Sequence, residues 1–278
     1  MQNNEVLYEV SDRIATLTLN RPDKLNAWTG QMDVEYRAAL AEAEQSPDVR
    51  VIIVTGAGRG FCAGADMGGL QATAEAGGTG GGNDRGELAK PGQGDDARDD
   101  YKRSYSFPPS VGKPIIAAIN GAAAGLGFVH MLYCDMRFAS EKAKFTTAFA
   151  RRGLVAEHGL SWLLPRIVGM HNAMDLTLSA RVITAQEAYE MGLVGKVFAA
   201  DELMDGVREY AIQLATFSSP RSMKVSKRLL WDAQFQGLGE AIDEANKEMI
   251  ISLTTDHFKE GVNSFLEKRT PEWPPVEV

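Results

Sequence analysis

The sequence has few cysteines and no long apolar run, and both absences narrow its possible setting. Its 278 residues include two cysteines, Cys62 and Cys134, and no C-x-x-C pair. A disulfide framework is therefore not expected, and a reducing, cytoplasmic compartment fits best. No apolar run approaches the roughly 18 residues of a membrane span, and the start MQNNEVLYEV lacks the positive and apolar regions of a signal peptide. We expect neither a membrane partner nor export.

Motifs for common cofactors, metals and nucleophiles are also missing. The sequence contains no G-x-G-x-x-G, no G-x-x-x-x-G-K-[ST], no H-E-x-x-H and no G-x-S-x-G. Its four histidines and two cysteines form no cluster along the chain, so we expect neither a metal site nor a separate cofactor.

Positive charge is in deficit, because 29 Lys and Arg face 37 Asp and Glu, which gives a net charge of −8. This balance argues against nucleic acid and anionic membranes as general partners, although a local site can still be basic. With 44% hydrophobic and 24% charged residues, the chain should form a globular protein with a sizeable core.

Residues 71–99 have few large apolar side chains and many glycines, among them Gly77-Gly78 and Gly80-Gly81-Gly82. Such a segment buries too little surface to offset the entropy of ordering, so we expect a mobile loop. A linker between two domains is the alternative.

The apolar patterns predict short strands alternating with helices, followed by a helical C-terminal part. Strands are expected at 6–10, 14–19, 51–55, 115–119, 136–139, 143–146 and 196–198. Helices are expected from a cap at Thr29 to about 43, at 99–110, from 126, and at 159–168, 172–178, 185–191, 201–217, 220–233 and about 238–267.

Two glycine-rich loops follow predicted buried strands and lead into helices. GAGRGFCAGAD (56–66) follows the first, and NGAAAGLG (120–127) follows the second. Backbone N–H groups at a helix start lack partners and can stabilise an oxygen that becomes anionic. Each loop alone can also be a plain tight turn. Together they suggest two donors that converge on one point, an oxyanion hole.

Six ordered segments make the chain resemble the crotonase superfamily, which includes enoyl-CoA hydratases and isomerases. They are LNRPDKLNAW (19–28), GAGRGFCAGADM (56–67), KPIIAAINGAAAGLG (113–127), RRGLVAEHG (151–159), LPRIVG (164–169) and ITAQEAYEMGLVGKV (183–197). The resemblance implies an α/β fold in which β-β-α turns form a spiral core over residues 1–200. It also implies a helical trimerisation region at 201–278, and assembly into homotrimers or dimers of trimers.

The resemblance also implies an acyl-CoA substrate and an enolate stabilised by the N–H groups of Ala65 and Leu126. Hydratases of the superfamily carry two glutamates, and their positions correspond to Val129 and Phe149 here. Neither side chain can carry a proton, so paired acid–base addition of water is not expected. Val129 and Phe149 should instead line the substrate pocket.

One carboxylate remains at a position where related isomerases have an acid, Glu157 in GLVAEHG. We interpret Glu157 as the catalytic acid/base; the alternative is a surface acid near a helix start. His158 adjoins Glu157 and can orient it. His130 follows the lost glutamate position by one residue and is either buried structure or a second catalytic candidate.

Coenzyme A contacts are implied by the same resemblance. The positions that match lie in the loop before the first helix, around the first oxyanion donor, and near the C-terminus. They are Lys24, Asn26, Ala27, Ala63, Asp66 and Lys268, the last possibly from a neighbouring subunit. Plain packing of the last helix with a solvated basic end is the alternative for Lys268.

The sequence therefore predicts an enzyme that shifts a proton along an unsaturated acyl-CoA by means of Glu157. Four alternatives remain open: hydration, hydrolysis and C–C cleavage on the same fold, and binding of acyl-CoA without catalysis.

Overall fold

The computed structural model describes residues 4–75, 77 and 98–276. Most of the expected mobile loop lies outside these residues. Its first five positions, 71–75, were wrongly assigned to the loop, because they complete helix α2 (Met67–Glu75).

A six-stranded sheet forms the centre of the molecule, in the order β1-β2-β3-β5-β7-β10. Its strands are β1 (Val6–Ser11), β2 (Ile14–Leu19), β3 (Val51–Gly56), β5 (Ile115–Ile119), β7 (Met136–Ser140) and β10 (Lys196–Phe198). Only β1 and β2 pair antiparallel; the other neighbours are parallel. Strands β3 and β5 are buried along their whole length, as continuous apolar strands of a parallel sheet should be.

A second sheet has the order β4-β6-β8-β9. It consists of β4 (Gly60–Cys62), β6 (Ala122–Ala124), β8 (Lys144–Thr146) and β9 (Ile183–Thr184). The chain places one strand in the large sheet, the next in the small sheet, and then forms a helix, as in β3-β4-α2 and β5-β6-α3. This repeated turn confirms the predicted spiral of β-β-α units.

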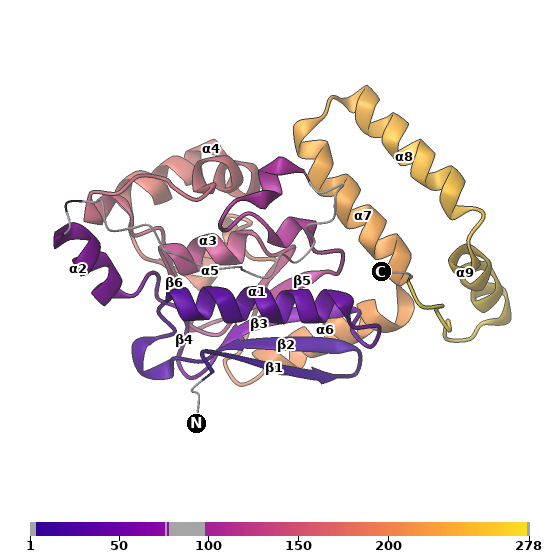
Figure 1. Ribbon diagram of the computed structural model, residues 1–278, viewed down its shortest axis with the longest axis horizontal. Coiled ribbons are helices and arrows are strands. Elements are labelled where there is room, and N and C mark those ends of the chain that lie inside the picture. Colours follow the sequence, from indigo (N-terminus) through magenta and orange to yellow (C-terminus); the bar gives the residue numbers. More distant parts are fainter. Residues whose placement is uncertain (1–3, 76, 78–97, 277–278) are drawn as a thin grey trace.

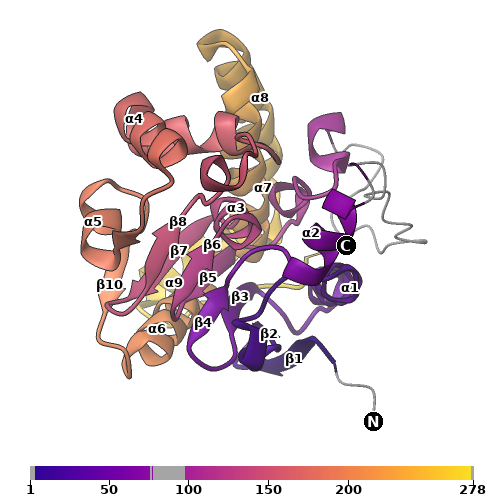
Figure 2. The same ribbon diagram turned by 90° about the vertical axis from the view of Figure 1, so that its left-hand side faces the viewer.

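Helices cover both faces of the large sheet (Figures 1 and 2). Helix α1 (Gly30–Gln45) is capped by Thr29 as predicted, since the Thr29 hydroxyl accepts from the N–H of Met32 at 3.0 Å. It shares the main core with α3 (Leu126–Leu132), whereas α6 (Leu203–Phe217) packs on the other face. Side chains alternate between the faces: Ile52 belongs to the first cluster and Ile53 to the second.

Four predicted helices differ in their boundaries. The expected helix at 99–110 is two short 3₁₀ helices, η2 (Asp99–Lys102) and η3 (Pro108–Ser110). The two expected helices between 159 and 178 run together as α4 (Leu160–Ser179), with a break in backbone geometry at Gly169. The expected helix at 238–267 is α8 (Leu238–Ser252) and α9 (Asp256–Glu267), because Thr255 caps a new helix.

The remaining helices are α5 (Ala185–Glu190) and α7 (Pro220–Asp232), with 3₁₀ turns η1 (Pro22–Lys24), η4 (Ala150–Arg152) and η5 (Ala233–Phe235). Helices α8 and α9 extend away from the sheets (Figure 1). No helix within the described ranges is long and apolar enough to cross a bilayer.

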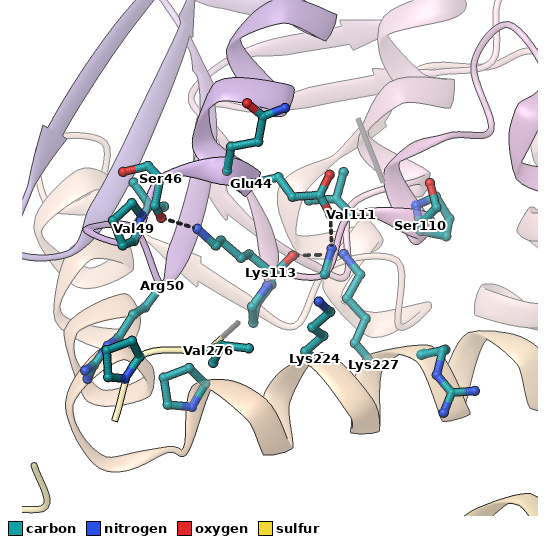
Figure 3. A pocket seen from close by; sticks show the side chains of 18 of the residues that line it. Glu44, Ser46, Val49, Arg50, Ser110, Val111, Lys113, Lys224, Lys227 and Val276 are labelled. Carbon is teal, nitrogen blue, oxygen red and sulfur yellow. Dashed lines mark hydrogen bonds between the residues drawn. The ribbon is translucent and has the colours of Figure 1, made fainter. Parts of the chain in front are cut away.

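A cavity of about 1070 Å³ lies between the end of α1, the start of β5 and helix α7. Two of its lysines bond to the protein itself. Lys113 donates to the carbonyls of Ala43 (2.7 Å) and Ser46 (2.6 Å), as Figure 3 shows in part. Lys227 pairs with Asp135 at 2.7 Å. We interpret this cavity as a seam between the spiral core and the C-terminal helices.

Candidate active site at the two glycine loops

The two glycine loops predicted to form a site are in contact. Gly64 and Gly125 have φ of 104° and 51°, a region that suits glycine. A Cβ atom on Gly64 would lie 3.0 Å from the carbonyl oxygen of Ala124 and 3.7 Å from the nitrogen of Leu126. The loop after β4 therefore lies directly against the start of α3.

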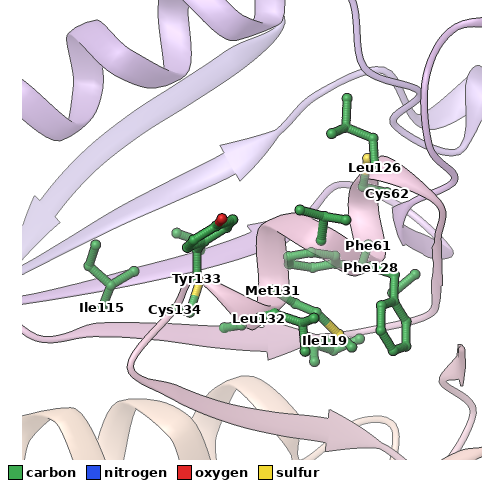
Figure 4. Packing of buried hydrophobic residues seen from close by; sticks show 14 of the residues in the cluster. Phe61, Cys62, Ile115, Ile119, Leu126, Phe128, Met131, Leu132, Tyr133 and Cys134 are labelled. Carbon is green, nitrogen blue, oxygen red and sulfur yellow. The ribbon is translucent and has the colours of Figure 1, made fainter. Parts of the chain in front are cut away.

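Glycine is also required one step into the helix. A Cβ atom on Gly127 would overlap the carbonyl oxygen of Cys62. Figure 4 shows the apolar packing around α3, with Cys62 and Leu126 near its first turn. The close approach of helix and strand fixes the relative position of both loops.

The backbone N–H groups of Ala65 and Leu126 belong to the two loops that are in contact. Trp28 N–H donates to Gly64 (2.7 Å), and Asp66 N–H donates to Trp28 (2.9 Å). These bonds belong to the residues on either side of Ala65, so the N–H of Ala65 itself points away from Trp28. Leu126 is the first residue of α3, so its N–H has no acceptor within the helix.

Val129 and Phe149, the positions that the resemblance matches to the hydratase glutamates, carry apolar side chains. Val129 and Phe149 are 0% and 6% exposed, and both belong to the main core. Neither can exchange a proton.

Glu157 lies in the turn between η4 and α4. Its side chain is 34% exposed, and its Oε2 lies 3.5 Å from Nε2 of His158. His158 and Gly159 both have positive φ, 57° and 83°, which reverses the chain sharply. The hydroxyl of Tyr133 donates to the His158 carbonyl at 2.9 Å and thereby ties this turn to the end of α3.

A row of aromatic rings runs from Trp28, in the loop before α1, to His158, the neighbour of Glu157. Trp28 stacks on His130 with centroids 3.7 Å apart, and His130 meets Tyr105 edge to face at 5.3 Å. Tyr105 then meets His158 at 4.7 Å. His130 is 4% exposed and lies inside this row. The row brings together His130, His158 and Glu157, which were singled out from the sequence.

The loop before α1 pairs with the first glycine loop. Ala63 N–H donates to the carbonyl of Leu25 at 2.9 Å. Arg21 donates to Asp66 (3.0 Å) and to the carbonyl of Ala27 (2.6 Å). The hydrogen bond from Arg21 lowers the pKa of Asp66 and keeps it ionised. Lys24 ends η1 and is exposed.

Two expected ligand contacts differ in position from the others: Asn26 is buried between the loops, and Lys268 lies far from them. Asn26 is fully buried, and its side chain accepts from the N–H of Arg21 and donates to the carbonyls of Ala57 and Gly60. Its amide therefore holds the loops together. Lys268 follows α9, which Figure 1 places at the opposite end of the molecule from α2. Within one chain it lies apart from the loops.

Sequence reasoning missed three residues that build this site: Arg21, Trp28 and Tyr105. Arg21 and Trp28 lie in the segment 19–28 that carried the resemblance, so that segment was the available signal. Tyr105 has no local signal, because its partners His130 and His158 are 25 and 53 residues away by their numbers. In the described part of the chain, no group of three His, Cys, Asp or Glu side chains is placed to hold a metal.

Comparison with known families gives one match over nearly the whole chain. The model of the enoyl-CoA hydratase/isomerase family matches residues 9–275. The chain is 33% identical to 1,2-epoxyphenylacetyl-CoA isomerase of Escherichia coli, covering 96% of this chain and 97% of that protein. It is 35% identical to the peroxisomal Delta(3,5)-Delta(2,4)-dienoyl-CoA isomerase of Arabidopsis thaliana, covering 92% and 91%.

Solved structures give the same result for the fold. The crystal structure of a probable enoyl-CoA hydratase/isomerase from Mycobacterium abscessus superposes with a TM-score of 0.84 at 29% identity, covering 98% of this chain and 99% of that one.

Proposed function

Because the chain belongs to the enoyl-CoA hydratase/isomerase family, and thus to the crotonase superfamily, we propose that it isomerises an unsaturated acyl-CoA thioester with Glu157 as the proton carrier. This membership confirms the family expected from the six sequence segments. The reaction, the catalytic residues and the assembly are our proposals.

The observation that supports the proposal is the contact between the two glycine loops, which carry the N–H groups of Ala65 and Leu126, together with the carboxylate of Glu157. The N–H groups of Ala65 and Leu126 would donate to the thioester oxygen as it becomes an enolate. Each such donor typically lowers the barrier by about 2.7–4 kcal/mol. Val129 and Phe149 are apolar and buried, so Glu157 is the one acid in the positions that matter for this family.

One carboxylate suffices for a proton shift. Glu157 removes a proton from one carbon of the acyl chain, and the electron pair moves into the thioester carbonyl to form the enolate. Glu157 then returns the same proton to another carbon, and the double bond changes position. The mass of the substrate does not change. Addition of water would need a further group to hold and activate the water.

The coenzyme A part would lie along the paired segments before α1 and after β4. Lys24 supplies an exposed positive charge there, and Ala27 and Ala63 supply backbone. Asp66 and Asn26 hold these segments in shape. We propose that Lys268 reaches a site only from a neighbouring copy in a homo-oligomer built by residues 201–278.

The test is a comparison of wild type with Glu157→Gln, which keeps size and removes the titrating group. Acyl-CoA thioesters are screened by mass spectrometry. Isomerisation leaves the mass of the thioester unchanged, whereas hydration adds the mass of one water. For the substrate found, kcat should fall by ~10²–10⁴ in Glu157→Gln, while acyl-CoA binding persists.

The matched control is Glu209→Gln, since Glu209 is exposed on α6; it should leave kcat unchanged. Equal kcat in wild type and Glu157→Gln would remove Glu157 from the mechanism. A product heavier by one water would favour hydration, and binding without turnover of any thioester would favour the non-catalytic alternative.

A further inference from the structure

We infer that the cavity beside His158 holds the acyl group and selects acyl groups that end in an aromatic ring. This rests on the proposed function, because it assigns the acyl end of the substrate to one wall of the same site. The cavity has a volume of about 510 Å³. It is lined by His158, whose ring lies 3.5 Å from the Glu157 carboxylate. An acyl group in it would therefore extend from the proton carrier.

The cavity is unusually rich in aromatic rings. Those that the argument uses are Tyr105, Tyr133, Trp162, Trp231 and Phe235. They come from α3, α4, α7, η5 and the segment before η3, so distant parts of the chain contribute to one surface. Apart from His158 and Gly159, the other lining residues belong to the segment 100–106.

The polar atoms of two of these rings are bonded to the protein. The Tyr133 hydroxyl donates to the carbonyl of His158 at 2.9 Å, and the Trp231 Nε1–H donates to Asp135 at 2.9 Å. These bonds fix both rings. They also turn the polar ends of Tyr133 and Trp231 toward the protein, so these two rings offer mainly carbon surface to a ligand.

One wall is a continuous stack of four planar groups. The Arg166 guanidinium lies 3.9 Å from the centroid of the Trp162 ring, which stacks on Phe235 at 4.9 Å and 16°. The guanidinium of Arg98 covers Phe235 at 4.2 Å. Because cation–π and ring contacts join α4, η5 and residue 98, this wall is held rigidly in place.

A rigid wall of flat rings favours a flat, rigid ligand. The faces of Trp162 and Phe235 are covered by each other and by the two guanidinium groups, so an aromatic ring gains edge-to-face contacts with these rings beyond the area it buries. A straight alkyl chain of equal carbon number gains none of these and loses rotation about several bonds when it is held. We therefore expect an acyl group with a terminal ring to bind about 10-fold more tightly than an alkyl chain of equal carbon number. A difference of about 10-fold in affinity corresponds to the free energy of about two such ring contacts.

The experiment compares two saturated thioesters of equal carbon number, 3-phenylpropanoyl-CoA and nonanoyl-CoA, by calorimetry. Neither carries a double bond to move, so binding is measured without turnover. Wild type should prefer the phenyl ligand about 10-fold. In Trp162→Leu the preference should fall below about 3-fold, and Trp162→Phe, which keeps a ring in the wall, should retain it.

Outcomes separate this inference from the proposed function. Equal affinities in wild type, or a preference unchanged by Trp162→Leu, would overturn the aromatic cavity and leave the acyl-CoA site standing. No binding of either thioester would overturn the proposed function itself. If circular dichroism shows that Trp162→Leu does not fold, Phe235→Leu replaces it, because Phe235 is the partner ring in the stack and is 37% exposed.

Discussion

Trp28 and His130 stack in the interior with ring centroids 3.7 Å apart and an interplanar angle of 26°. The backbone of Trp28 holds the residues on either side of Ala65. His130 lies on α3, whose first residue is Leu126. The stack therefore links the elements that carry the two proposed oxyanion donors.

Removal of the His130 ring should make the positions of the Ala65 and Leu126 N–H groups less fixed, without removing either group. We expect His130→Ala to lower kcat roughly tenfold, less than the ~10²–10³ typical for loss of a whole donor, with a smaller change in KM. His130→Phe keeps a stacking ring and should retain most of kcat. Steady-state kinetics of the two variants gives the comparison.

A spectroscopic measurement separates positioning from a general loss of folding. Hydrogen bonds to the carbonyl of a conjugated thioester such as cinnamoyl-CoA shift its absorption to longer wavelength when it binds. The shift should shrink in His130→Ala and persist in His130→Phe. A full shift together with unchanged kcat in His130→Ala would contradict the positioning role.

Most of the large sheet could be predicted from the sequence because its signals are local. Continuous apolar runs such as Ile115–Ile119 mark buried parallel strands, and Thr29 marks the start of α1. Strands β4 and β6 have three residues each, and their pairing partners lie far along the chain. Runs this short carry no usable periodicity, so β4 and β6 were not predicted as strands, whereas β8 of the same sheet was expected at 143–146.

The turns of the two glycine loops were predictable because they depend on backbone conformation, whereas the side-chain contacts around them depend on packing and were not. The glycines at 64, 125 and 127 indicate tight turns and a close approach of backbone segments from the sequence itself. The ring contacts of Tyr105 arise only when the segment before η3 folds against α3 and the turn at His158. The internal role of Asn26 likewise depends on carbonyl groups more than 30 residues away, as its bonds show.

Hydration should be slow in this protein. Val129 and Phe149 are buried and apolar, so neither position supplies a second carboxylate to activate water. We expect crotonyl-CoA hydration with kcat well below the ~10 s⁻¹ that is typical of enzymes. The decrease of enoyl-thioester absorbance measures it, and a rate at or above that value would contradict the single-carboxylate mechanism.

The C-terminal helices expose large apolar side chains that suit contact with another copy of the chain. Phe265 and Leu266 on α9 are 83% and 71% exposed, and Leu238 at the start of α8 is 80% exposed. We propose that this apolar surface contacts another copy of the chain. We expect Phe265→Glu to reduce the mass of the assembly measured by light scattering. Asn263→Glu, on the same helix but off its apolar face, should leave it unchanged, and a monomeric wild type would overturn the expectation.

Lys113 should make stability depend on pH in a specific window. Burial lowers its pKa from 10.5 to about 8, with Lys224 adding to the effect and Glu44 opposing it. Between about pH 8 and 10.5 the unfolded chain still holds this proton while the folded chain has released it. The unfolded state then binds more protons, so the contribution of Lys113 to the free energy of unfolding rises with pH through this window.

The measurement is the difference in free energy of unfolding between wild type and Lys113→Met, from urea titrations at pH 7 and pH 10. This difference should move in favour of wild type as pH rises. Burial raises the pKa of Cys62 and of Cys134 to about 12, which acts in the opposite direction on absolute stability but cancels in the difference. Lys142→Met, at an exposed lysine, should show no such trend. A difference between wild type and Lys113→Met that stays constant from pH 7 to 10 would mean that the hydrogen bonds to Ala43 and Ser46 hold the lysine charged throughout.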